Sequence, residues 1–249
     1  MSGRALIVNA DDLGLSAGID RGIAWAHEHG IVTSASLMVR GLHAPEAAAW
    51  AAGRPRLGLG LHVDLGEWRC EDGTWVAAYE VVPPDDADAV RAEVVAQVER
   101  FVALTARAPA HLDSHQHVHR EEPARAALLE AGERLGVPVR HFAPGVRYEG
   151  GFYGQGRGGE PWPEGITVAA LCALLRALPP GVTELGCHPG LGAAGGSPYA
   201  RERAVEVATL CDPRVRATVE REGIELVGRG AGARGRGRAP AGAAPLAAR

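Results

Sequence analysis

Short apolar runs rich in β-branched residues alternate with helix-like stretches along most of the chain, and this alternation limits the folds that it can adopt. Strands that alternate with helices form parallel sheets covered by helices. About seven strands in 249 residues fit a (β/α) barrel better than a doubly wound sheet. The predicted strands are 4–8, 31–39, 57–65, 110–118, 137–141, 183–187 and 225–227. The predicted helices are 16–30, 44–53, 86–104, 123–135, 167–178, 202–210 and 215–222. The sequence therefore predicts one α/β domain, a (β/α) barrel, over residues 1–228.

The composition is that of an ordinary globular protein, with 46% hydrophobic and 22% charged residues. No apolar run reaches about 18 residues, so no transmembrane helix is expected. The start, MSGRALIVNADD, holds an apolar run too short for a signal peptide, which predicts a cytoplasmic protein.

Residues 229–249 differ from the rest of the chain, because they hold five Arg and no acidic residue. Their Arg-Gly-Ala composition lacks a core pattern and predicts a disordered tail that is dispensable for activity. Without this tail, 21 Arg stand against 30 acidic residues. Such an acidic body argues against nucleic acid as a partner.

Four polar clusters lie at the carboxyl ends of predicted strands. They are NADD at 9–12, LHVD at 61–64, HLDSHQHVH at 111–119 and CHPG at 187–190. In parallel barrels the carboxyl ends of the strands form one rim, where active sites lie. We therefore expect the four clusters to meet in space.

Asp11 and Asp12 are adjacent carboxylates after a buried strand, where like charges repel unless a cation shares them. A divalent metal on one of them, with the other free as a base, resolves this conflict. Asp also favours solvated turns and helix N-caps, and such a turn is the alternative for this pair.

Segment 111–119 holds His111, His115, His117 and His119. Their odd numbers, shared by Asp113, predict that on a strand these side chains face the same way. This concentration predicts a metal or catalytic role. His115 with His119 has a spacing common in zinc sites, and His115 with a histidine of another strand is equally compatible with the geometry.

His62 and His188 are single histidines in apolar surroundings. His62, between Leu61 and Val63, is either a core residue or a metal ligand. His188 precedes a Pro-Gly turn, where it either caps or packs, or serves as a general acid because imidazole titrates near neutral pH.

The segments LIVNADDLGLSAGID, GIVTSASLMV, GLGLHVDLG, HLDSHQHVH, FYGQ and ELGCHPG follow one another over roughly residues 4–228. In these segments and their order the chain resembles the YdjC-like carbohydrate deacetylase family, which includes chitooligosaccharide deacetylases and the deacetylase of hopanoid biosynthesis. Leu13 is the one departure near the first motif, where relatives often have Phe.

This resemblance implies a distorted (β/α) barrel of the glycoside hydrolase/deacetylase type that removes the N-acetyl group from an amino sugar. Asp12, His62 and His115 are then the ligands of one divalent metal ion, Mg²⁺ or Zn²⁺, with Mn²⁺ or Co²⁺ as further options. Asp11 is then the general base and His188 the general acid. The family acts on different acetylated sugars and so does not fix the substrate; the expected substrate is a chitooligosaccharide-like or lipid-linked N-acetylglucosamine, because the loop 144–165 holds aromatic residues and few charges.

Residues 144–165, rich in Gly, Pro and aromatic residues, are predicted to form one long loop, and loops above about 12–15 residues usually have a function. Phe152, Tyr153 and Trp162 offer flat apolar faces that can stack on sugar rings. The alternative is a surface loop whose aromatic residues pack on their own helix.

Two other functions remain as alternatives. One is a metal-dependent phosphoesterase on a related barrel, against which the acidic body and the absence of Lys argue. The other is a non-catalytic sugar-binding barrel, which would predict the loss of a ligand or of the base. The expected partner is the acetylated sugar, and a homodimer is an option for the assembly.

Overall fold

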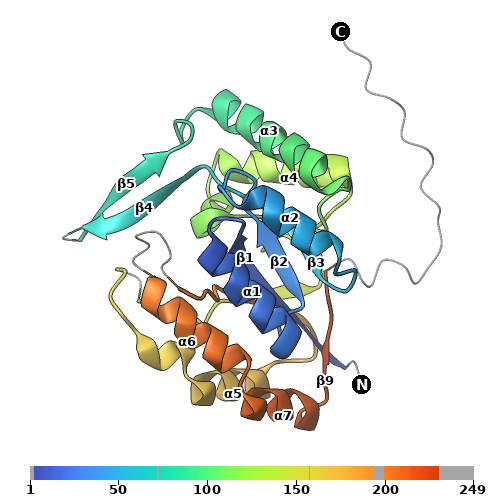
Figure 1. The fold of residues 1–249 in the computed structure, drawn as a ribbon. Coiled ribbons are helices and arrows are strands. Elements are labelled where there is room, and N and C mark those ends of the chain that lie inside the picture. Colours follow the sequence, from blue (N-terminus) through green and yellow to red (C-terminus); the bar gives the residue numbers. More distant parts are fainter. Residues whose placement is uncertain (1–2, 72, 157, 193–198, 230–249) are drawn as a thin grey trace.

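The computed structural model describes residues 3–71, 73–156, 158–192 and 199–229. At its centre a seven-stranded sheet, parallel in every pairing, curls into a half-barrel (Figure 1). Six strands follow the order β6-β3-β2-β1-β8-β7, and β9 pairs with the beginning of β1. The strands are β1 (Arg4–Leu13), β2 (Ser34–Leu37), β3 (Gly58–Val63), β6 (Leu112–Ser114), β7 (Val146–Glu149), β8 (Gly181–Cys187) and β9 (Ile224–Leu226).

Helices surround this sheet, and several begin at a residue that caps them. The side chains of Ser16, Asp86, Thr167 and Asp212 accept hydrogen bonds from backbone N–H groups of the first turn. The helices are α1 (Ala17–His29), α2 (Ala44–Ala52), α3 (Ala87–Thr105), α4 (Ala124–Leu135), α5 (Val168–Ala177), α6 (Ala200–Leu210) and α7 (Pro213–Arg221). None of the helices in the described residues is long and apolar enough to cross a membrane.

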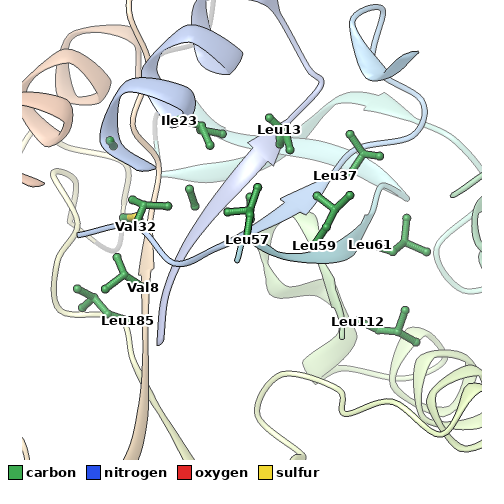
Figure 2. Close-up of a cluster of buried hydrophobic side chains, with 14 of the residues drawn as sticks. Val8, Leu13, Ile23, Val32, Leu37, Leu57, Leu59, Leu61, Leu112 and Leu185 are labelled. Carbon is green, nitrogen blue, oxygen red and sulfur yellow. The ribbon is translucent and has the colours of Figure 1, made fainter. Parts of the chain in front are cut away.

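Apolar side chains form a continuous row across neighbouring strands. Leu13, Leu37, Leu61 and Leu112 are register partners in β1, β2, β3 and β6, and Figure 2 shows them in sequence across the sheet. All four are fully buried in one cluster that includes Ile23 of α1. Because the burial of a leucine contributes about 1.5–3 kcal/mol, this row attaches the helices to the sheet.

Polar side chains alternate with these leucines, and they are also buried. Asn9, Ser36, His62 and Asp113 are each at most 1% exposed. Ser36 joins two of them, since its hydroxyl donates to Asp113 and accepts from the Asn9 amide. Successive side chains of a strand point to opposite faces. The interior of the half-barrel is therefore a polar, hydrogen-bonded layer that leads to the carboxyl ends of the strands.

The predicted α/β barrel class is confirmed, and the ring remains open on one side. In the predicted strand 137–141, Val139 makes an isolated parallel bridge with Leu112. Among the described residues no pairing joins Val139 to β7. Strand β7 itself lies in the segment 144–165, which we predicted to be a loop.

A two-stranded antiparallel hairpin, which lies between β3 and α3 in the sequence, projects from the body of the protein (Figure 1). Its strands are β4 (Gly66–Glu71) and β5 (Thr74–Glu80). The sequence analysis predicted no strand here. Most residues of β5 are exposed, so this strand lacks the apolar pattern by which the other strands were predicted.

The predicted start of the tail, residue 229, is one residue too early. Arg229 is only 6% exposed, and its guanidinium pairs with the buried carboxylate of Glu184 on β8. The folded barrel therefore includes Arg229. The rest of the predicted tail, 230–249, lies outside the described residues.

Replacing Arg229 by Met should destabilise the fold, because it leaves a buried carboxylate without one of its partners. Loss of one partner of a buried ion pair costs about 3–5 kcal/mol, and the lower end is expected here because Arg140 still contacts Glu184. The measurement is the free energy of unfolding in urea.

The control is Arg214→Met, since the Arg214 side chain is 73% exposed in its pair with Asp212. Exposed pairs contribute about 0–1 kcal/mol. Equal destabilisation by the two substitutions would contradict a structural role for Arg229.

Candidate active site

The end of β1 departs from regular strand geometry and brings two carboxylates together. A register shift interrupts the pairing with β2 between Ala10 and Leu13, and Asp12 has a left-handed φ of 69°. Neighbouring residues of a regular strand point to opposite faces. The irregularity lets both Asp11 and Asp12 place a carboxylate oxygen near His62. Such strained backbone costs about 1–3 kcal/mol and is concentrated at functional sites.

Asp12, His62 and His115 present ligand atoms to a common point. His62 Nε2 lies 3.3 Å, and His115 Nδ1 3.2 Å, from Asp12 Oδ1. This buried oxygen has no hydrogen-bond partner among the described residues. One atom from each side chain lies within 4.8 Å of the other two, and a carboxylate with two imidazoles is a donor set that could hold a metal ion.

A second layer of polar groups orients His62 and Asp12. Asp113 accepts a hydrogen bond from His62 Nδ1 at 2.8 Å, which directs Nε2 toward Asp12. Arg203 donates to Asp12 Oδ2 at 2.6 Å and so leaves Oδ1 for the cluster. Partners of this kind fix the orientation of metal ligands.

The surrounding carboxylates make this place attract positive charge. Burial would lower the pKa of His62, but the charge and hydrogen bond of Asp113, together with the nearby carboxylate of Asp12, raise that pKa to about 10. Burial also lowers the pKa of His115, but the nearby carboxylates of Asp12 and Glu67 raise it to about 9. Both imidazoles are therefore protonated at neutral pH when no cation is bound.

Arg140 is fully buried and its guanidinium contacts three carboxylates. Nη1 and Nη2 donate to the two oxygens of Asp11 at 2.7 and 2.8 Å, and Nε donates to Glu184 at 2.9 Å. Nη2 also lies 2.7 Å from Asp113 Oδ2. Burial would raise the pKa of Asp11, but Arg140 outweighs burial and lowers this pKa to about 2. Asp11 is thus ionised throughout the neutral range.

His188 lies just after β8, in a turn that packs closely against α1. A Cβ on Gly22 of α1 would lie 2.3 Å from Gly190 Cα, so glycine is needed for this approach. His188 Nε2 is 3.8 Å from Asp11 Oδ2. Burial lowers the pKa of His188 to about 4, so its imidazole is neutral at rest. A role as general acid therefore requires that His188 gain a proton during the reaction.

Glu206 holds the backbone of His188 in place. Its carboxylate accepts from the N–H of His188 and from the Tyr199 hydroxyl, both at 2.5 Å. Tyr199 in turn stacks on Tyr153, with ring centroids 4.7 Å apart. These contacts connect α6, the turn at His188 and the aromatic segment that follows β7.

A cavity of about 900 Å³ opens beside these groups. Trp68 and Trp75 of the β4–β5 hairpin contribute to its wall, and so do Phe152 and Tyr153. Among the proposed site residues, the cavity is lined by Asp12, His115 and His188. Trp162 is 47% exposed and is not among the described residues that line the cavity, although its backbone N–H donates to Gly154 O, next to Tyr153. Phe152 is 1% exposed, so most of its ring belongs to the core.

The segment predicted as strand 110–118 leaves strand geometry after Ser114, and the short 3₁₀ helix η1 (His115–Arg120) follows. Gln116 and His117 have left-handed φ values of 49° and 54°. The predicted common face of the histidines is therefore wrong beyond His115, because this turn breaks the alternation.

The turn at 116–117 divides the histidines into two groups. His115 joins His62 and Asp12, while His117 and His119 join His141. Of the two pairings that the sequence left open, the structure thus brings His115 together with His62.

Sequence reasoning missed Arg140, Arg203 and Glu206. Arg203 and Glu206 share the buried side of α6 with Val207 and Leu210. The helical spacing of these two charged residues from the apolar core positions was the signal by which their burial could have been predicted. Arg140 directly follows an apolar run at the end of a predicted strand, as the other polar clusters do.

Comparison with known proteins shows the family. The profile described as YdjC-like protein matches residues 5–221. The chain belongs to this family. It is 32% identical over 245 residues to a carbohydrate deacetylase of Geobacillus stearothermophilus, a match that covers 90% of this chain and 96% of that protein. It is also 32% identical over 255 residues to a chitooligosaccharide deacetylase of Serratia marcescens, covering 90% and 97%. The resemblance inferred from the motifs is confirmed.

Solved structures with a similar fold include a protein named for cellobiose-phosphate cleavage and a carbohydrate esterase. A protein of Enterococcus faecalis matches with a TM-score of 0.73 at 23% identity, over 92% of this chain and 98% of that one. A family 4 carbohydrate esterase of Streptomyces lividans, solved with acetate, matches with a TM-score of 0.56 at 11% identity, over 91% and 93%. At these identities the likeness concerns the fold alone.

Glu206 should make the stability of the protein fall as the pH rises. Burial raises its pKa from 4.5 to about 7, against the hydrogen bonds from Tyr199 and His188 that lower it. A carboxyl with a higher pKa in the folded state binds more protons when folded, so stability is lost between its unfolded and folded pKa values. Relative to Glu206→Gln, the free energy of unfolding of the wild type should fall by roughly 3 kcal/mol as the pH rises over this window.

The measurement is urea unfolding of both proteins from pH 4.5 to 7, with a chelator present. Glu220→Gln, an exposed change on α7, is the control and should follow the wild type. Parallel pH curves for the wild type and Glu206→Gln would contradict a buried carboxyl with a raised pKa.

Proposed function

We propose that this chain removes the N-acetyl group from an N-acetylated amino sugar, giving the free amine and acetate, with one divalent cation held by Asp12, His62 and His115. That it is a carbohydrate deacetylase rests on its family and on its similarity to two named deacetylases over 90% of its length. The single observation that supports the chemistry is the buried Asp12 oxygen, without a hydrogen-bond partner among the described residues, between two imidazoles.

The donor set agrees with a divalent cation. A cation bound to these residues would polarise the acetyl carbonyl and lower the pKa of a water molecule. Two imidazoles and a carboxylate favour Zn²⁺, Co²⁺ or Mn²⁺, whereas Mg²⁺ prefers oxygen ligands. A comparison of Zn²⁺ with Mg²⁺ therefore tests this preference most directly.

Asp11 is proposed as the general base. Arg140 binds both of its oxygens and keeps it ionised, so Asp11 is in the form that accepts a proton at neutral pH, and its low pKa makes it a weak base whose role depends on position. Arg140 also fixes the carboxylate plane, which positions Asp11 for that transfer. General acid–base catalysis of this kind contributes about 10²–10⁴-fold to the rate.

His188 is proposed as the general acid. Its imidazole is neutral at rest, and its Nε2 lies 3.8 Å from Asp11 Oδ2. We propose that the proton accepted by Asp11 passes to this nitrogen and then to the leaving amine. The carboxylate of Glu206 binds the backbone N–H of His188 and so keeps the ring at the cavity wall.

The cavity favours an extended neutral sugar. Its volume of about 900 Å³ exceeds what one monosaccharide fills, and Trp68, Trp75 and Tyr153 offer rings to its wall. We therefore propose a chitooligosaccharide-like or lipid-linked N-acetylglucosamine as substrate. A cytoplasmic location and a homodimeric assembly stay predictions.

The rival functions make different demands on the site. A non-catalytic sugar-binding barrel has no need of an ionised Asp11 beside a histidine. A phosphoesterase would favour several cations free to bind phosphate, but of the arginines that line the described cavity wall Arg203 is paired with Asp12 and Arg69 with Glu71, which leaves Arg120. The ionised Asp11 and this small number of free cations favour deacetylation.

The function is tested by acetate release from four substrates, each with added Zn²⁺ or Mg²⁺ and with chelator. They are diacetylchitobiose, N-acetylglucosamine, its 6-phosphate and an N-acetylglucosaminyl lipid. We expect acetate from the first or the last, lost with chelator. Hydrolysis of a phosphodiester without acetate from any sugar would favour the phosphoesterase, and preference for the 6-phosphate would contradict a neutral substrate.

Substitution of the two adjacent carboxylates should separate metal binding from turnover. Asp12→Asn should remove most of the bound cation, because it weakens the one anionic ligand of the group. Asp11→Asn should keep the cation and lower kcat by about 10²–10⁴-fold, the usual contribution of a general base. Elemental analysis and acetate release measure the two effects.

Asp88→Asn is the matched control, since that side chain is 96% exposed on α3 and should change neither property. Near-normal acetate release by Asp11→Asn would exclude it as the base. Full retention of the cation by Asp12→Asn would exclude this residue as a ligand.

A further inference from the structure

Three histidines that the proposed deacetylation does not use form a second cluster beside the same cavity. His117 and His119 belong to η1, and His141 lies two residues after Val139. One ring nitrogen of each histidine lies within 4.8 Å of those of the other two. His117 also lines the cavity, so the cluster is accessible from it.

Two of these nitrogens are spaced like ligands of one metal ion. His117 Nδ1 lies 3.1 Å from His141 Nε2. Two nitrogens each about 2.0–2.1 Å from a tetrahedral zinc ion are about 3.3 Å apart. Little movement is therefore needed for both to bind the same cation.

The third histidine has a nitrogen without a partner. His119 is 0% exposed, and its Nε2 has no hydrogen-bond partner among the described residues. Its Nδ1 lies 2.6 Å from the Ser114 hydroxyl, so Nε2 is the nitrogen that remains for a ligand. Buried polar atoms are rarely left without a partner. A cation in the cluster would provide one.

Hydroxyl groups contact the outer nitrogens of His117 and His119, and such contacts fix the orientation of histidines that bind metals. The Tyr148 hydroxyl lies 3.2 Å from His117 Nε2, which leaves His117 Nδ1 to face His141. Tyr148 is placed by Gly186, where a Cβ would lie 2.4 Å from the tyrosine oxygen. Tyr148 thus orients His117, as Ser114 does for His119.

The backbone of the cluster is strained at three residues. Gln116, His117 and His141 have φ values of 49°, 54° and 68°, a left-handed region that residues other than glycine seldom adopt. Strain of this kind is retained where a functional geometry depends on it. Here it turns His117 and His141 toward each other.

We infer that His117, His119 and His141 form a second metal site, which takes one transition-metal cation of the Zn²⁺ class. Three imidazoles without a carboxylate favour Zn²⁺, Co²⁺, Ni²⁺ or Cu²⁺ over Mg²⁺ and Ca²⁺, which prefer oxygen. The charges of Arg140 and Arg120 oppose a cation here, and the carboxylates around Arg140 offset part of this effect, so the three imidazoles must supply the affinity.

The test is the zinc content of the full chain after removal of metal and dialysis against Zn²⁺ in excess Mg²⁺. The wild type should hold two Zn²⁺ per chain by elemental analysis. His119→Ala should hold one, His62→Ala should hold one, and the double variant none. His141→Gln, a change at a partly buried residue, should also lose one ion, and circular dichroism verifies that each variant is folded.

His29→Ala, an exposed change on α1, is the control and should keep both ions. Zinc content unchanged in both His119→Ala and His141→Gln would overturn the inference. The result also separates this site from the proposed active site. One ion that is lost in His119→Ala and kept in His62→Ala would support the three-histidine site and contradict the metal role of His62.

Discussion

The guanidinium of Arg140 lies where the polar interior of the half-barrel meets its catalytic end, and three buried carboxylates depend on it. Without this cation, Asp11 and Asp113 would be buried like charges, and Glu184 would keep only Arg229 as a cationic partner; buried charges with too little compensation are costly to keep ionised. With it, the proposed base Asp11, the partner of His62 and a carboxylate of β8 share one rigid, ionised group. The geometry of the candidate site and the stability of the sheet therefore depend on the same contacts.

The strands perform two tasks because their side chains alternate. The row of leucines toward the helices supplies the apolar burial that holds the fold (Figure 2). The other side can then carry polar groups such as Asn9 and Ser36, which satisfy one another by hydrogen bonds. This division leaves the carboxyl ends of the strands free for chemistry. It also explains how a carbohydrate deacetylase can keep a highly charged site inside a stable domain.

The sequence predicted those parts of the fold and site that local periodicity encodes. The seven helices were predicted to within a few residues at each end, and the facing of Asp113 and His115 followed from alternation. The prediction failed where backbone geometry departs from a repeat, as at Gln116 and His117, or where a strand is exposed on both sides, as in the hairpin. Arg140 was missed because its partners come from three separate strands, which only the folded chain brings together.

The raised pKa values of His62 and His115, about 10 and about 9, have a consequence for how a cation enters. At neutral pH each imidazole carries a proton, and a bound metal ion requires both in the deprotonated form. Entry of a divalent cation would therefore be an exchange for two protons that leaves the net charge of the pocket unchanged. The protonated histidines supply a counter-charge for Asp12 when no cation is bound, so the pocket can fold complete without one.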